Sequence, residues 1–226
     1  MQTLMSLRTT DGLDKRGLGI GKKWLAKDEA RRKLMWDLIL KINYSIQDFN
    51  ATIEGGFSGE PKDVIYLIVL ADWIKRSYWQ IKNCLRDDVS KGFEFSDSAR
   101  LELCLDFLEA TRSFVVAHPE GTNKHPKYGF SGGRICVDVR TKSIMDDFPR
   151  AKLYRLYIEG IVEAESVRDD DVVLVTYSED PNDGGGLHFQ RVCFDMGDVR
   201  DVAQLYIDAL YELDRYVSRL RKKDFE

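Results

Sequence analysis

The chain is poor in the residues that build metal sites and disulfides. It holds only four cysteines and three histidines among 226 residues. The cysteines, at positions 84, 104, 136 and 193, form no CxxC pair, so we expect reduced structural cysteines. The histidines, at positions 118, 125 and 188, show neither HExxH nor Cys/His spacing, so a zinc site would need scattered ligands. We therefore expect no metal and no cofactor.

Long hydrophobic runs and export signals are also missing. The longest apolar run, Val64 to Ala71, is far too short to cross a bilayer, and residues 1–10 lack the apolar core of a signal peptide. These features predict a cytoplasmic protein with no membrane segment. No GxSxG elbow marks a serine nucleophile. Hydrophobic residues still make up 43% of the chain, which is enough for a sizeable core without disulfides.

A strong positive charge is absent as well, because the formal net charge is −4. This balance argues against a general nucleic-acid binder. The charge is unevenly spread, however. Residues 14–41 carry nine Lys or Arg against four acids, and residues 120–142 carry five against two, whereas residues 163–183 hold eight acids and one Arg. A local phosphate-binding surface fits this pattern better than a long groove, although ordinary solvated faces explain residues 14–41 equally well.

The first half of the chain has helical periodicity. We expect residues 1–23, which are rich in glycine and charge, to form a mobile arm. Their Gly17–Lys22 segment lacks the Walker spacing and a preceding strand, which disfavours a phosphate loop. Apolar residues at three- and four-residue steps predict helices over 24–51, over 61–85 and from about 98 towards 118. Pro61 suits the first turn of the second helix.

The second half changes to strand periodicity. Alternating apolar residues predict strands at 135–139, 153–158 and 172–177, and the Gly/Pro/Asp-rich segment 178–186 predicts a hairpin to a strand at 187–194. A final amphipathic helix is expected over 199–222. The fold class is therefore α+β: an N-terminal helical bundle, then a small antiparallel sheet and a long C-terminal helix. We expect residues 134–226 to pack on the bundle.

The most informative stretch joins the two halves. The third helix ends in Arg112-Ser-Phe-Val-Val-Ala-His118-Pro119, followed by a polar loop with a second His-Pro at His125. Pro119 disfavours the helical conformation for His118, so the helix should stop there. On a continuous helix Arg112 and His118 would point about 240° apart. They can meet only if the backbone leaves the helix between them or if a second subunit completes the site.

At this point the sequence resembles the HEPN superfamily of helical domains, whose ribonuclease members carry an Arg-x4-6-His motif near the end of a late helix. The matching residues are Arg112 and His118. In those families the residue after the arginine is usually Asn, Asp or His, and this chain has Ser113 there, which is polar but a weaker match. The resemblance covers residues 24–133. It implies a homodimer in which two motifs face each other, and RNA as the substrate. A place in a defence or toxin–antitoxin system and a partner protein are further expectations.

The two motif residues suffice for metal-independent endoribonuclease chemistry. His118 titrates near neutrality and can take the proton from an RNA 2′-hydroxyl. Arg112 can hold the non-bridging oxygens as negative charge builds on them. The expected products are a 2′,3′-cyclic phosphate and a 5′-hydroxyl. Ser113, Lys124 and His125 are candidates for positioning the phosphate.

Three other interpretations remain open. The chain can be a non-catalytic helical module that binds a nucleotide or a partner protein, or a structural protein with an accidental motif. His118 can also simply cap the last carbonyls of its helix.

Asp72 interrupts a buried helical run, and a buried carboxylate must find a partner. Arg112 is one candidate for that partner, and a solvated or backbone-capping position is the alternative.

Overall fold

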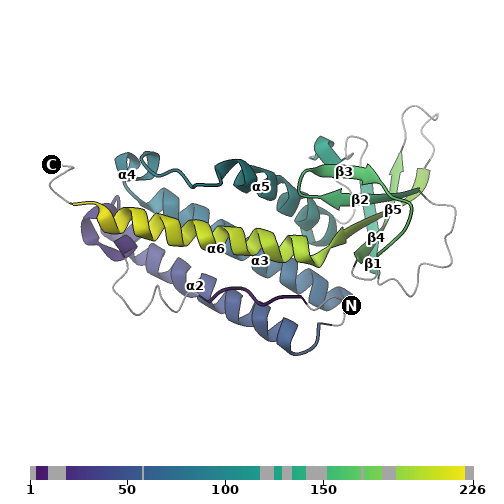
Figure 1. The fold of residues 1–226 in the computed structure, drawn as a ribbon, viewed down its shortest axis with the longest axis horizontal. Helices are drawn as coiled ribbons and strands as arrows, with labels where there is room; N and C mark the ends of the chain where they lie inside the picture. Colours follow the sequence, from purple (N-terminus) through teal and green to yellow (C-terminus); the bar gives the residue numbers. More distant parts are fainter. Residues whose placement is uncertain are drawn as a thin grey trace.

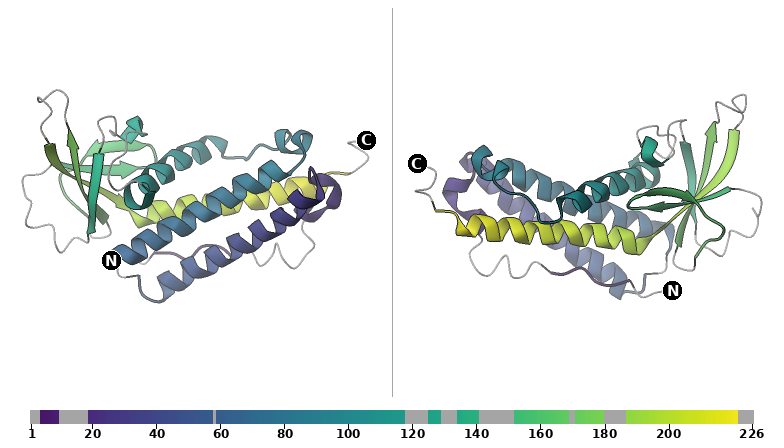
Figure 2. Two further views of the ribbon diagram at one scale, coloured as in Figure 1. Left: turned by 180° about the vertical axis from the view of Figure 1, so that it is seen from behind. Right: turned by 45° about the horizontal axis from the view of Figure 1, so that its top comes forward.

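The computed structural model describes residues 4–9, 19–57, 59–117, 125–128, 134–140, 152–168, 171–179 and 187–221. An elongated helical bundle carries a five-stranded sheet at one end (Figure 1). Its long helices are α2 (Glu29–Glu54), α3 (Pro61–Cys84), α5 (Ser98–Arg112) and α6 (Met196–Arg219). A short helix, α4 (Asp87–Lys91), lies at the end away from the sheet (Figure 2). The α+β class is confirmed. None of the helices in these ranges is long and apolar enough to cross a membrane.

The first long helix begins at Glu29 rather than at residue 24. The backbone N–H of Lys27 donates to the carbonyl of Cys84 at 3.1 Å, which ties the chain before the helix to the end of α3. The Asp28 carboxylate then caps α2 by accepting a backbone hydrogen bond from its first turn at 2.8 Å. The start of α3 at Pro61 is confirmed.

Helix α6 is part of the helical bundle and shares its hydrophobic core. The rings of Tyr206 and Tyr78 lie 5.6 Å apart, and those of Tyr216 and Phe93 are at the same distance. The main hydrophobic cluster runs continuously through α2, α3, α5, α6 and the sheet. The amphipathic pattern of α6 therefore faces helices from the first half of the chain.

Parts of the segment expected to be a mobile arm pack on the bundle. Leu7 and Ile20 are buried. The Leu7 backbone N–H donates to the side chain of Asn50 at 2.7 Å. The Lys22 ammonium donates to the carbonyl of Ser218 at 2.9 Å and so caps the end of α6. The expectation needs revising for residues 4–9 and 19–23.

The sheet has the order β1-β4-β5-β2-β3. Its strands are β1 (Arg134–Arg140), β2 (Lys152–Tyr157), β3 (Gly160–Glu163), β4 (Asp171–Glu179) and β5 (Leu187–Asp195). Strands β4 and β5 pair antiparallel from Glu179 opposite Leu187 to Asp171 opposite Asp195, which confirms the predicted hairpin. The Asp195 side chain caps α6, which follows β5 directly.

The prediction of a purely antiparallel sheet is wrong. Strand β2 pairs parallel with β5, with Leu153 opposite Arg191, so the sheet is mixed. The short strand β3, which was not predicted, forms a hairpin with β2 and makes the outer edge. An alternating sequence defines the two faces of a strand but not the direction of its neighbour. The physical reason for the error is therefore that pairing direction is a property of the whole fold.

A buried ion pair joins strands β2 and β4 on the sheet face that points away from the bundle. The Arg155 guanidinium contacts the Asp171 carboxylate, and both side chains are almost fully buried. The backbone N–H of Arg168 donates to the same carboxylate at 2.6 Å. A small apolar cluster of Leu153, Val173 and Cys193 lies on this face. The opposite face joins the main core.

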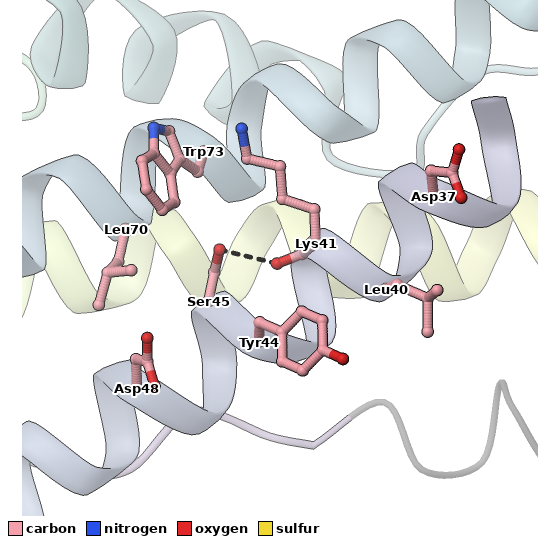
Figure 3. Close-up of a pocket in the computed structure, with 8 residues that line it drawn as sticks. All are labelled: Asp37, Leu40, Lys41, Tyr44, Ser45, Asp48, Leu70 and Trp73. Atoms are coloured by element: carbon pink, nitrogen blue, oxygen red, sulfur yellow. Dashed lines mark hydrogen bonds between the residues drawn. The ribbon is translucent and has the colours of Figure 1, made fainter.

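Helices α2 and α3 pack side by side, and their outer edge carries a hollow of about 400 Å³. Figure 3 shows Lys41 and Tyr44 from α2 on one side and Leu70 and Trp73 from α3 on the other. The Lys41 ammonium lies 4.5 Å from the centre of the Trp73 ring.

Asp198, in the first turn of α6, gives a pH-dependent prediction. Burial raises its pKa to about 6, and the nearby carboxylates of Asp195, Asp201 and Glu159 add to this, whereas Arg100 opposes it. The folded chain thus binds a proton between about pH 4 and 6 that the unfolded chain has lost, so stability falls as the pH rises through this window.

We expect Asp198→Asn to raise the free energy of unfolding by about 1–2 kcal/mol at neutral pH and by much less near pH 4. Urea unfolding followed by circular dichroism at both pH values measures this difference. An equal effect at both pH values, or no gain at neutral pH, would contradict the assignment.

Candidate functional site

The helix that carries Arg112 changes its winding directly after this residue. Helix α5 ends at Arg112, and residues Ser113–Ala117 continue as a π-helix. A π-turn holds one more residue than an α-turn and is frequent at functional sites. The angle of about 240° assumed a continuous α-helix, and residues 113–117 do not continue as one. His118 itself lies outside the described residues.

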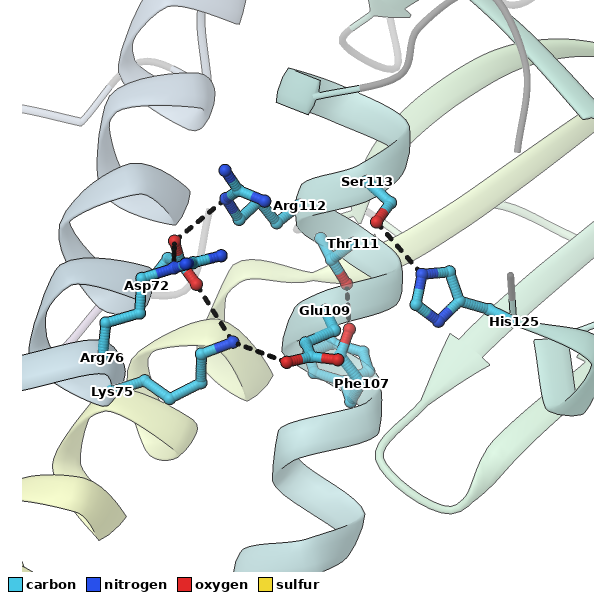
Figure 4. Close-up of polar contacts among 9 residues, drawn as sticks. All are labelled: Asp72, Lys75, Arg76, Phe107, Glu109, Thr111, Arg112, Ser113 and His125. Atoms are coloured by element: carbon cyan, nitrogen blue, oxygen red, sulfur yellow. Dashed lines mark hydrogen bonds and ion pairs between the residues drawn. The ribbon is translucent and has the colours of Figure 1, made fainter. Parts of the chain in front are cut away.

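Arg112 points from α5 towards α3, where it meets Asp72 (Figure 4). The Arg112 Nε atom lies 2.9 Å from Asp72 Oδ2. The Arg76 Nε atom donates to the same oxygen at 2.7 Å. Only 4% of the Asp72 side chain is exposed, so its charge requires such partners. Of the two interpretations of Asp72, the structure confirms the ion pair with Arg112.

Two further charged residues complete what we call the Asp72 cluster: Asp72, Lys75, Arg76, Glu109 and Arg112. The Lys75 ammonium is buried and lies 3.0 Å from Asp72 Oδ1 and 3.2 Å from Glu109 Oε1. Sequence reasoning missed Lys75 and Arg76. The signal was present, because residues three and four positions after an aspartate share its helix face.

The cluster contains three cations and two carboxylates, which leaves one positive charge. Both arginines contact Asp72 through Nε, which is one of the five N–H donors of a guanidinium. Within the part of the chain that the structure describes, their Nη groups remain as donors beyond this contact. The Arg76 side chain is 58% exposed and that of Arg112 is 31% exposed. Two adjacent guanidinium groups fixed by one carboxylate can bind a phosphate with little loss of side-chain freedom.

Ser113 and His125 lie on the other side of the helix end. Figure 4 shows Ser113 pointing away from Arg112 and towards His125. The His125 Nε2 atom lies 3.0 Å from the Ser113 hydroxyl oxygen. These two predicted phosphate-positioning residues are thus brought together, but not onto the Asp72 cluster. The third, Lys124, lies outside the described residues.

The segment that follows the motif is anchored to the sheet. The Tyr128 hydroxyl donates to the carbonyl of Ile158 at 3.2 Å, in the turn between β2 and β3. Burial raises the pKa of Tyr128, and the nearby Asp106 carboxylate adds to the effect. Since His125 contacts Ser113, both described flanks of residues 118–124 lie beside the end of α5.

The competing sites find little support in the described ranges. Lys22, from the glycine-rich segment considered as a phosphate loop, instead donates to the last carbonyls of α6. Cys84, Cys104 and Cys193 are buried free thiols, as expected. No group of three or more metal-ligating side chains gathers among the residues whose placement is described.

Comparison of the chain with protein families, with curated proteins and with solved structures finds no match in any of the three. The geometry of the Asp72 cluster and the motif sequence therefore carry the functional argument.

Proposed function

We propose that the protein is a metal-independent endoribonuclease whose Asp72 cluster binds the phosphate at the cleavage site. The observation that carries this proposal is the pair of guanidinium groups of Arg76 and Arg112, held by one buried carboxylate beside the end of α5. Asp72 fixes the Arg112 side chain before substrate arrives. Such preorganised charge is the strongest means of stabilising a transition state that gains negative charge.

In this proposal His118 is the general base, six residues after Arg112. It takes the proton of the 2′-hydroxyl, the 2′-oxygen forms a bond to the adjacent phosphorus, and the bond to the 5′-oxygen breaks. The departing 5′-oxygen takes a proton from water and becomes the 5′-hydroxyl. Arg112 stabilises the charge on the non-bridging oxygens. We further propose a homodimer with RNA as the substrate, as the HEPN resemblance implies, in which the two motifs of the dimer lie together.

The test is incubation of the purified chain with mixed RNA in EDTA. We expect cleavage that leaves 2′,3′-cyclic phosphate and 5′-hydroxyl ends, because neither the proposed base nor the charge stabiliser is a metal. Mapping of the product ends identifies this chemistry. Cleavage that requires added metal, or that leaves 3′-hydroxyl ends, would contradict the mechanism.

A second candidate is a module that binds a nucleotide without cleaving it. The position of His125 favours this candidate. Its imidazole lies near the end of α5 but contacts Ser113 on the side away from Arg112, so it does not form a pair with that arginine. Such a module would use the same two guanidinium groups for binding. RNA that binds tightly and stays intact in the assay above would support this candidate.

A further inference from the structure

Trp73 lies next to the Asp72 cluster on α3 and is exposed. It has 40% of its surface accessible, whereas most tryptophans of a folded chain lie largely inside. Arg76 follows it by three residues, so the two side chains share one face of the helix. An aromatic face is thereby placed beside the guanidinium groups proposed to bind phosphate.

Lys41 links this tryptophan to a second hollow. Its ammonium lies 4.5 Å from the Trp73 ring centre, and the residue lines both the hollow of about 400 Å³ and a second one of about 350 Å³. The second hollow is bordered by Lys75 and Arg76 from α3 and by Glu109 from α5. The surface therefore continues from the aromatic ring to the Asp72 cluster.

We infer that Trp73 and Lys41 form a base-binding subsite for single-stranded RNA, next to the phosphate site at Arg76 and Arg112. This inference rests on the proposed function. A base stacks on the Trp73 ring in place of the Lys41 ammonium, which then moves to a neighbouring phosphate. Aromatic rings bind bases of any sequence because every base has a π-face, and cations beside them contact the backbone. Paired bases are already stacked, so duplex RNA cannot use the subsite.

The test measures binding of a fluorescently labelled, 2′-O-methylated single-stranded RNA by anisotropy. This probe lacks the nucleophilic 2′-hydroxyl, so it reports binding whether or not the chain cleaves RNA. We expect Trp73→Ala to weaken binding by about 5- to 100-fold, and Trp73→Phe to restore most of the affinity. Duplex RNA should bind wild type and Trp73→Ala alike.

Trp36 provides a matched control. It is 36% exposed and lies about 140° from Lys41 around α2. We expect Trp36→Ala to bind the probe within about 2-fold of wild type, because a base stacked on Trp36 would not lie beside the cations of the proposed site. Thermal melting of all variants checks their folding.

Each outcome separates this inference from the proposed phosphate site. Weak binding by Trp73→Ala together with normal binding by Arg112→Gln supports the subsite and contradicts the phosphate site. Normal binding by Trp73→Ala together with weak binding by Arg112→Gln overturns the subsite alone. Failure of the folded wild type to bind the probe overturns both, whereas equal weakening by Trp36→Ala and Trp73→Ala overturns the subsite alone.

Discussion

Replacing Asp72 by alanine is expected to lower the free energy of unfolding by about 3–5 kcal/mol. The Asp72 carboxylate is the shared partner of Arg76, Lys75 and Arg112. Without it, Lys75 stays buried with only the half-exposed Glu109 as its counter-charge, and three cations repel one another at the contact between α3 and α5. Urea unfolding followed by circular dichroism measures the change.

Glu109→Gln is the matched control, because it removes a carboxylate from the same cluster. The Glu109 side chain is 48% exposed, so its ion pair with Lys75 contributes at most about 1 kcal/mol. The two variants should therefore differ strongly in stability. An Asp72→Ala variant as stable as Glu109→Gln would show that Asp72 does not organise the cluster.

Replacing His118 by alanine is expected to lower the rate of RNA cleavage by about 10²- to 10⁴-fold, because the proton acceptor is lost. Arg112→Lys should cause a comparable loss, since an ammonium cannot reproduce the two-pronged contact of a guanidinium. Both variants should melt near the wild-type temperature, because Asp72 keeps Lys75 and Arg76 as partners. Single-turnover cleavage at saturating enzyme isolates the chemical step.

His125→Ala distinguishes the two imidazoles of the segment. His125 contacts Ser113 on the side away from Arg112, so its loss should reduce the rate by less than about 10-fold, in the range of a positioning contact. A larger loss for His125→Ala than for His118→Ala would transfer the role of base to His125. Undiminished cleavage by His118→Ala would remove His118 from the mechanism.

The helices and the β4–β5 hairpin could be predicted because their signals are local. Apolar spacing and Pro61 place α3 correctly, and the glycine-rich segment after Tyr177 marks the turn between β4 and β5. The predicted start of α2 at residue 24 is wrong, although the Asp28 N-cap is a local signal for a start at Glu29. The backbone contact between Lys27 and Cys84 that ties down the preceding segment joins residues far apart in the sequence, and no local pattern encodes it.

The arrangement of the sheet and of the site depends on similarly distant contacts. The alternation of apolar and polar residues in β2 does not indicate that this strand pairs parallel with β5. The burial of Leu7 and Ile20 arises because α2 and α6 offer surfaces to them. At the site, Asp72 interrupts an apolar run, which predicts a buried charge with Arg112 as a candidate partner. The sequence does not predict that Arg76 donates to the same Asp72 oxygen.

The central claim, that Arg76 and Arg112 bind a phosphate of RNA, is tested most directly by the salt dependence of binding. Each phosphate contact contributes about 0.7 to the slope of log K against log salt for single strands. With the 2′-O-methylated probe, Arg112→Gln and Arg76→Gln should each lower the slope by about this amount, while Arg86→Gln, which alters an exposed arginine paired with Asp88 before α4, should leave it unchanged. Slopes for Arg76→Gln and Arg112→Gln equal to the wild-type slope would contradict the claim.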